Sequence, residues 1–234
     1  MIKPVFTFSL LAGLFFLVSC GGGTQESGSG EAGSESAEPD TELPAEGTSK
    51  LGVELLNPNR ATPEELAALP GITDELAQQI FDNRPYLSMA TFDSQYGATF
   101  EEEKEQVYGS LFIPLNLNTA PESEIKMIPG VGDKMAHEFE EYRPYVKMAQ
   151  FRKEIGKYVD DNEVERLTQY VFVPVNLNEA TEAEILAIPG VGEKMAHEFE
   201  EYRPYSSMEQ FRKEIGKYVD EAEVSRLERY VTLQ

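Results

Sequence analysis

The sequence predicts an all-α protein whose folded part begins near residue 51 and consists of three consecutive units. Three observations carry this prediction: identical strings recur sixty residues apart, apolar residues within them recur at helical spacing, and Pro-Gly pairs interrupt the helical pattern. The chain has 234 residues, of which 41% are hydrophobic, with one Cys and no Trp. This composition excludes fibrous and multi-pass membrane proteins, and a single cysteine excludes an internal disulfide framework.

The N-terminal segment predicts a secretion signal rather than a domain. Lys3 provides a positive charge, residues 5–18 form an apolar stretch, and Ser19 precedes Cys20. The pattern resembles the signal of bacterial lipoproteins, in which cleavage before the cysteine leaves a lipid on the new N-terminus. A membrane-spanning helix needs about 20 apolar residues, which is more than this stretch contains. We therefore expect residues 1–19 to be a signal peptide, with lipidation at Cys20.

The next segment, residues 20–50, is rich in Gly, Ser and Glu and contains almost nothing that could be buried. Such a segment is predicted to be disordered, because it cannot bury enough apolar surface to offset the loss of conformational entropy. A flexible chain of this length spans roughly 30 Å. We therefore expect an acidic tether and an extracytoplasmic protein, anchored by its lipid to the outer or inner membrane of a cell envelope.

Three predicted repeats follow the tether: repeat one at 51–113, repeat two at 114–173 and repeat three at 174–234. Repeats two and three share Asn-Leu-Asn, Pro-Gly-Val-Gly and the string MAHEFEEYRPY, each sixty residues apart. Repeat one is a weaker copy that contains Asn-Pro-Asn, Pro-Gly-Ile-Thr and Arg-Pro-Tyr. A recent duplication explains such identity equally well, so identity alone does not indicate a function.

Repeat three illustrates the expected helices in order. Thr181 and Glu184 form a capping box, so a first helix is expected to start there and to run to Ile188, before a Pro-Gly pair. A second helix is expected at about 193–202, and Asp220 is expected to cap the fourth. The third helix is predicted from apolar residues at helical spacing, namely Met208, Phe211 and Ile215.

The segments between the repeats, residues 111–115 and 170–175, are apolar and each contains a proline. Proline cannot donate a backbone hydrogen bond to a neighbouring strand. We therefore expect extended connectors that pack against the helices and do not form a sheet.

Paired helices around a Pro-Gly-Val-Gly turn, preceded by Asn-Leu-Asn and followed by a helix that ends in Tyr-Arg, resemble the helix-hairpin-helix domain of the ComEA family of DNA-uptake proteins. The resemblance covers about 180 residues as three tandem double helix-hairpin-helix units. In that family the hairpins hold duplex DNA by its backbone, sometimes with a cation bound by the hairpin carbonyls. The resemblance therefore implies DNA-phosphate binding by two sets of residues: Gly130, Val131, Gly132 and Lys134, and Gly190, Val191, Gly192 and Lys194.

The chemistry of the Gly-Val-Gly turn agrees with that implication. Its glycines are expected to allow positive φ and to open backbone N–H groups at a helix N-terminus to a phosphate. The valines are expected to point into the core, and the lysines to reach the same phosphate. The sequence contains no nucleophile paired with a base, no cofactor fingerprint and no complete set of metal ligands, so we expect a binding protein and not an enzyme.

The charge of the chain opposes this function. The formal net charge is −22, and the three repeats carry −8, −3 and −6. Repeat one has Thr73 and Glu75 where the other repeats have the second glycine and the lysine, and the second hairpins of repeats two and three have Asp160 and Asp220 next to the helix. We expect these degenerate hairpins to be structural. A local basic face is expected only in repeat two, from Lys126, Lys134, Lys147, Arg152, Lys153 and Lys157.

Two functions stay open on this basis. The first is sequence-independent binding of duplex DNA at the cell envelope, as in the uptake of external DNA during competence. The second is an acidic envelope scaffold that binds a protein partner and no DNA, in which the hairpins only shape the fold. The intact hairpins favour the first function, and the net charge favours the second.

Overall fold

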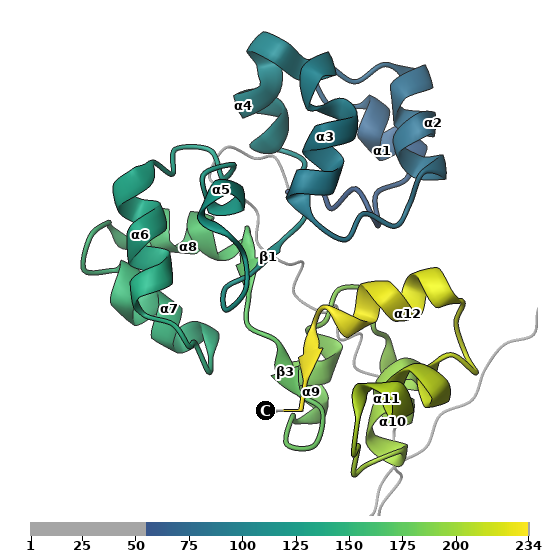
Figure 1. Ribbon diagram of the computed structural model, residues 1–234. Helices are drawn as coiled ribbons and strands as arrows, with labels where there is room; N and C mark the ends of the chain where they lie inside the picture. The colour runs from purple at the N-terminus through teal and green to yellow at the C-terminus, as the bar shows by residue number, and fades with distance from the viewer. Residues whose placement is uncertain (1–54, 234) are drawn as a thin grey trace, which may run out of the picture. The chain divides into compact units, whose positions relative to one another are not determined.

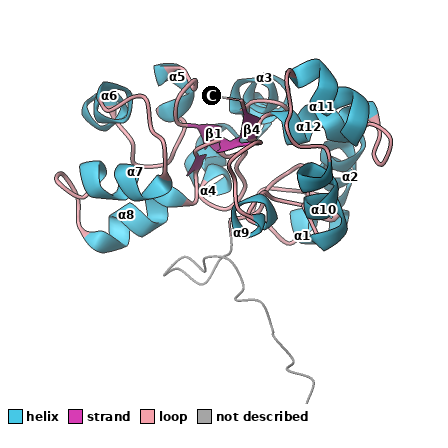
Figure 2. Cartoon of the chain, turned by 90° about the horizontal axis from the view of Figure 1, so that it is seen from below, coloured by secondary structure: helices cyan, strands magenta, loops and turns pink. Residues whose placement is uncertain are grey.

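The computed structural model describes residues 55–233. The predicted signal peptide, the lipidation site Cys20 and the acidic tether lie outside these residues. The described part is mostly helical, and its helices are paired into hairpin units, as expected (Figures 1 and 2). Within residues 55–233, every helix is too short or too polar to cross a membrane.

The helices of the three predicted repeats follow one another in similar order. In repeat one they are α1 (Pro63–Ala67), α2 (Asp74–Asp82), α3 (Met89–Phe100) and α4 (Lys104–Tyr108), with a 3₁₀ turn at Glu101–Glu103. In repeat two they are α5 (Glu122–Ile125), α6 (Asp133–Glu141), α7 (Met148–Ile155) and α8 (Asp161–Thr168). In repeat three they are α9 (Glu182–Leu186), α10 (Glu193–Glu201), α11 (Met208–Ile215) and α12 (Glu221–Glu228).

The expected helix starts in repeat three are confirmed. Thr181 and Glu184 form the reciprocal capping box at the start of α9, and the Asp220 side chain accepts a hydrogen bond from the backbone N–H of Glu223 at the start of α12. The helix α9 ends at Leu186 rather than at Ile188. The N–H of Ile188 bonds to the carbonyl of Ile185 at 3.0 Å, which is the tighter spacing that commonly ends a helix.

The expectation that the connectors do not form a sheet is wrong. The strand β1 (Leu115–Asn116) pairs in parallel with β2 (Val171–Phe172), and β3 (Val175–Asn176) pairs in parallel with β4 (Val231–Thr232). The prolines do not prevent this pairing, because each stands one residue before its strand, where no ladder donor is needed. The pair β1–β2 joins the beginning of repeat two to the end of repeat two, and the pair β3–β4 does the same in repeat three.

The Asn-Leu-Asn and Arg-Pro-Tyr motifs have a structural role. In repeat two, the side chain of Asn118 donates to the carbonyl of Tyr145 at 2.9 Å and accepts from its N–H at 2.7 Å. The guanidinium of Arg143 donates to the carbonyls of Leu117 and Ala120, both at 2.5 Å. The same set of bonds recurs in repeat three. The motifs therefore fasten the segment after the second helix to the loop before the first.

The buried side chains form two hydrophobic clusters, one extending from Ala61 to Val171 and the other from Leu177 to Val231. Aromatic rings meet edge to face in both clusters, with Phe139 and Phe151 at 4.9 Å between centroids and Phe199 and Phe211 at 5.3 Å. Such burial supplies the main stabilisation of short helices, which are marginal in isolation. The hairpin turns thus pack against these hydrophobic clusters, which include Val131 and Val191.

Candidate nucleic-acid interface

The first glycine of each Gly-Val-Gly turn has the backbone conformation that the sequence predicts. Gly130 has a φ of 79° and Gly190 a φ of 87°, which side-chain-bearing residues rarely adopt. Val131 and Val191 are buried, each with 7% of its surface exposed, so the expectation that they point into the core is confirmed. Gly71 in repeat one has a φ of 81°, so the degenerate hairpin keeps the same turn.

The second glycine departs from the expectation of positive φ. Gly132 and Gly192 have φ values of −97° and −95°, because each is the N-cap of the following helix, a position that takes extended backbone. A Cβ atom at either position would meet nothing within 4 Å. The protein's own packing therefore does not require glycine there, and the space above these residues is open.

The first turns of α6 and α10 carry backbone N–H groups without an acceptor. Neither Gly132 nor Gly192 supplies a capping side chain, and the first N–H to be bonded in each helix belongs to Ala136 or Ala196, at 3.0 and 2.9 Å. The three preceding N–H groups of each helix have no partner in the part of the chain that the structure describes. Such groups, together with the positive end of the helix dipole, favour an anion.

The degenerate hairpins lack this feature, as expected. In repeat one the Thr73 hydroxyl accepts from the N–H of Leu76 at 3.2 Å. In the second hairpins, Asp160 and Asp220 accept from the N–H groups three residues later, at 2.9 and 2.8 Å. A side chain thus already occupies the position that an anion would take at these helices.

Lys134 and Lys194 are exposed in the first turns of α6 and α10, and the side chain of neither forms an ion pair or hydrogen bond with any other residue between 55 and 233. The other predicted basic residues behave differently. Carboxylates pair with most of them, as follows: Lys126 with Glu122 and Asp133, Lys147 with Glu184, Arg152 with Glu165, and Lys157 with Glu154. The expected basic face of repeat two is therefore largely neutralised, whereas the hairpin lysines remain available.

Sequence reasoning missed an arginine that supports the turn. In repeat two, Nη2 of Arg166 in α8 donates to the carbonyl of Pro129 at 2.8 Å, while Glu163 binds the same guanidinium. In repeat three, Arg226 pairs with Glu223 in the same manner and is only 4% exposed. The sequence does contain a signal for this arginine, because in both second hairpins an arginine follows a glutamate by three residues, the spacing of an ion pair along a helix.

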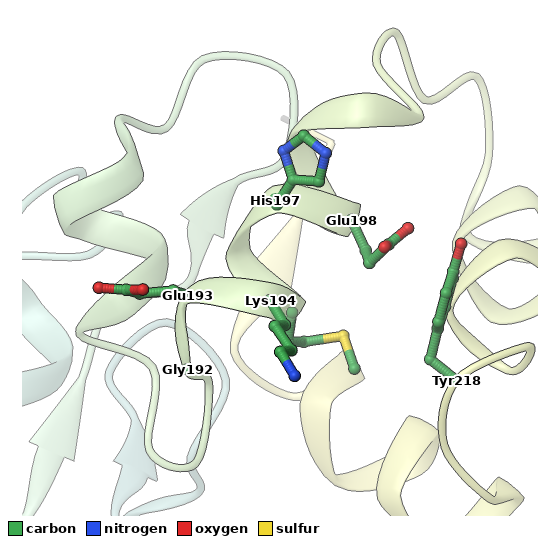
Figure 3. A pocket seen from close by; sticks show the side chains of 7 residues that line it. Gly192, Glu193, Lys194, His197, Glu198 and Tyr218 are labelled. Carbon is green, nitrogen blue, oxygen red and sulfur yellow. The ribbon is translucent and has the colours of Figure 1, made fainter.

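A pocket of about 700 Å³ beside the N-terminus of α10 was also missed (Figure 3). Gly192, Lys194, His197 and Glu198 line it from α10, and Tyr218 lines it from the loop before α12. The Nε2 atom of His197 lies 3.7 Å from Oε2 of Glu201, one turn further along α10. Residues 55–233 contain no group of three or more side chains that could hold a metal ion.

Comparison with known protein families agrees with the hairpin geometry of repeat three. A model of the helix-hairpin-helix motif matches residues 170–232, which include the turn from Gly190 to Gly192 and Lys194. This motif indicates nucleic-acid binding in general. No curated protein and no solved structure matches the chain.

Proposed function

We propose that the protein binds duplex DNA through its phosphate backbone, without reading sequence, at the hairpins of repeats two and three. The observation that carries this proposal is the combination of an unpaired, exposed lysine and backbone N–H groups without an acceptor in the same helical turn. Both kinds of donor suit a phosphate oxygen. Contacts of this kind position a protein on DNA but carry no sequence information.

The acidic surroundings set the expected strength of binding. Asp133 and Glu193 begin α6 and α10, and their carboxylates repel an approaching phosphate. In repeat two, Lys126 lies 3.1 Å from Asp133 and reduces that repulsion. The hairpin of repeat two is therefore expected to contribute more to binding, and the total affinity is expected to be modest and to fall steeply with salt.

An acidic interaction scaffold is the second candidate. The observation that favours it is the neutralisation of most basic residues by neighbouring carboxylates, in a chain with a net charge of −22. In this case a basic protein partner would meet the acidic faces. Replacement of Lys134 and Lys194 would then leave partner binding intact, which separates the two candidates.

Charge reversal at the two hairpins tests the DNA proposal. The double variant Lys134→Glu with Lys194→Glu should lose duplex binding without loss of helicity, because both lysines are exposed. The control is Lys153→Glu with Lys213→Glu, which changes the net charge equally on exposed positions of α7 and α11 and also breaks the pair of Lys213 with Glu214 at 3.7 Å. Affinity for a labelled duplex is measured by fluorescence anisotropy. Equal losses in both double variants would show that the hairpins are not the site.

We also propose that the lipid on Cys20 holds the protein in a cell envelope, where the hairpins capture external DNA as in DNA uptake. The support is the sequence pattern of residues 1–20 followed by an acidic tether. Metabolic labelling with a fatty-acid analogue and mass spectrometry of the mature N-terminus test this. Label and membrane association should disappear in Cys20→Ser, and a labelled Cys20→Ser protein would contradict the proposal.

A further inference from the structure

The pocket beside α10 combines three chemical features. It lies against the hairpin N-terminus at Gly192 and is an open hollow with a volume of about 700 Å³. The side chains that line it include a cation, Lys194, an aromatic ring, Tyr218, and two carboxylates, Glu193 and Glu198 (Figure 3). Each feature restricts the kind of molecule that fits.

The aromatic wall is the first feature. Tyr218 is 48% exposed, although its hydroxyl is held at 2.8 Å from the hydroxyl of Tyr202. The neighbouring Glu198 carboxylate and Tyr202 hydroxyl raise the pKa of Tyr218, and a tyrosine is neutral near pH 7. A fixed, neutral and exposed aromatic ring is a surface on which a flat ligand ring can stack.

The carboxylate is the second feature. Glu198 extends from α10 toward Tyr218 and lines the pocket (Figure 3), and its carboxylate lies close enough to the Tyr218 hydroxyl to raise the pKa of that tyrosine. The amino groups of nucleobases are donors that glutamate accepts in protein–DNA complexes.

We propose that this pocket binds an unpaired nucleobase whose own phosphate lies on Lys194 and the N-terminus of α10. The base stacks on Tyr218 and donates to Glu198. The proposal rests on the proposed backbone binding and extends it from the paired region of DNA to a single-stranded end or extension. A base inside a duplex is stacked and paired, so it does not reach the pocket.

Repeat two contains the same set of side chains. Tyr158 is 47% exposed with its hydroxyl 2.8 Å from that of Tyr142, and the neighbouring Glu138 carboxylate raises the pKa of Tyr158. Repeat one has Glu75 and Gln79 at the positions of the lysine and the glutamate. The pocket residues therefore accompany the hairpins with open helix N-termini and are missing from the hairpin whose N-terminus Thr73 caps.

The test measures how tightly the full chain binds three labelled DNAs. They are a blunt duplex, the same duplex with a short single-stranded adenine extension, and the same duplex with an abasic extension of equal length. The abasic extension has the same phosphates and no bases, so it isolates the contribution of the base. We expect the adenine extension to bind about fivefold or more tightly than the abasic one, since stacking of one base on an aromatic side chain contributes at least that much.

Two double variants locate the effect. Tyr158→Leu with Tyr218→Leu should abolish the preference for adenine and leave binding of the blunt duplex unchanged. Tyr158→Phe with Tyr218→Phe keeps both rings and should keep the preference, which shows that loss of the ring and not a change in folding is responsible.

The outcomes separate the two proposals. Equal affinity for the adenine and abasic extensions, or an undiminished preference in the leucine variant, overturns the base pocket while leaving duplex binding in place. Binding of the adenine extension without any binding of the blunt duplex supports the pocket and overturns the duplex proposal. If no DNA binds even at low salt, both proposals are wrong.

Discussion

Arg166 of α8 donates a hydrogen bond to the carbonyl oxygen of Pro129, at 2.8 Å, in the turn that leads into α6. This bond connects the second hairpin of repeat two to the turn of the first. In repeat one the corresponding space beside Gly71 is filled by the carboxylate of Glu103, which lies nearest, and by Val107, whose Cγ2 lies 3.5 Å from the position of a Cβ on that glycine. The second hairpin thus supports the first, by Arg166 in repeat two and by Glu103 and Val107 in repeat one.

Replacement of this arginine should weaken the fold. We expect Arg166→Val to lower the free energy of unfolding by about 1.5 kcal/mol, the lower end of the range for a hydrogen bond to a charged group. The variant should still fold, because repeat one keeps the same turn with no arginine beside Gly71, where Glu103 and Val107 lie. Urea unfolding followed by circular dichroism measures the change, and an unaltered unfolding midpoint would show that the bond contributes nothing.

Two buried tyrosines should respond in opposite ways to loss of the hydroxyl. Tyr145 is 2% exposed and its hydroxyl has no partner in the described chain, whereas the Tyr86 hydroxyl donates to the carbonyl of Ile80 at 2.9 Å. We expect Tyr145→Phe to leave stability unchanged or to raise it, and Tyr86→Phe to lower it by about 1 kcal/mol. Thermal or urea unfolding of both variants tests this, and equal losses would contradict it.

Stability should also decline in alkaline solution. Burial raises the pKa of Tyr145 to about 12, above the value of about 10 for an exposed tyrosine. Because the folded-state pKa is the higher one, the associated stability is complete below pH 10 and is lost as the pH rises through the folded-state value. The decline between pH 10 and 12 should be shallower in Tyr145→Phe, as measured by urea unfolding at each pH. Identical pH profiles would exclude Tyr145 as a cause.

The second glycine of the turn offers a test in which binding and stability separate. We expect Gly132→Thr with Gly192→Thr to keep the free energy of unfolding within a few tenths of a kcal/mol, because threonine and glycine are similar N-caps. Thr73 already caps α2 in this manner. DNA affinity should fall by about tenfold or more, since the hydroxyl would occupy the anion position and each hydrogen bond to a charged group contributes about 1.5–3 kcal/mol.

Anisotropy titration and urea unfolding of the same threonine variant provide the two measurements. Unchanged DNA affinity would mean that the open helix N-termini take no part in binding. An equal loss of stability and affinity would mean that the second glycine is needed for the fold, against the empty space that surrounds its missing Cβ atom.

Much of the fold could be predicted because its signals are local. The capping box at Thr181, the N-cap at Asp220 and the glycine with positive φ at position 190 each depend on a few neighbouring residues. The short strands could not be predicted in this way, because a two-residue pair leaves no alternation to detect. Leu115 finds its partner Val171 at the far end of the repeat, and only tertiary packing brings the two together.

The candidate site was predictable in part for a similar reason. The Gly-Val-Gly turns and hairpin lysines are contiguous in the sequence, but the groups that modify them are not. The carboxylate that pairs with Arg152 belongs to Glu165, and the carboxylate nearest Lys147 belongs to Glu184 in the next repeat. The negative φ of Gly132 also escaped prediction, since an N-cap and a positive-φ position both favour glycine.

A salt series of duplex titrations with the full chain tests the central claim most directly. If Lys134 and Lys194 each neutralise one phosphate, the logarithm of the affinity should fall linearly with the logarithm of the salt concentration, with a slope of about −1.8. The slope should be the same for duplexes of different sequence, because backbone contacts carry no sequence information. Absence of binding at low salt, or binding that does not weaken as salt is added, would contradict the account.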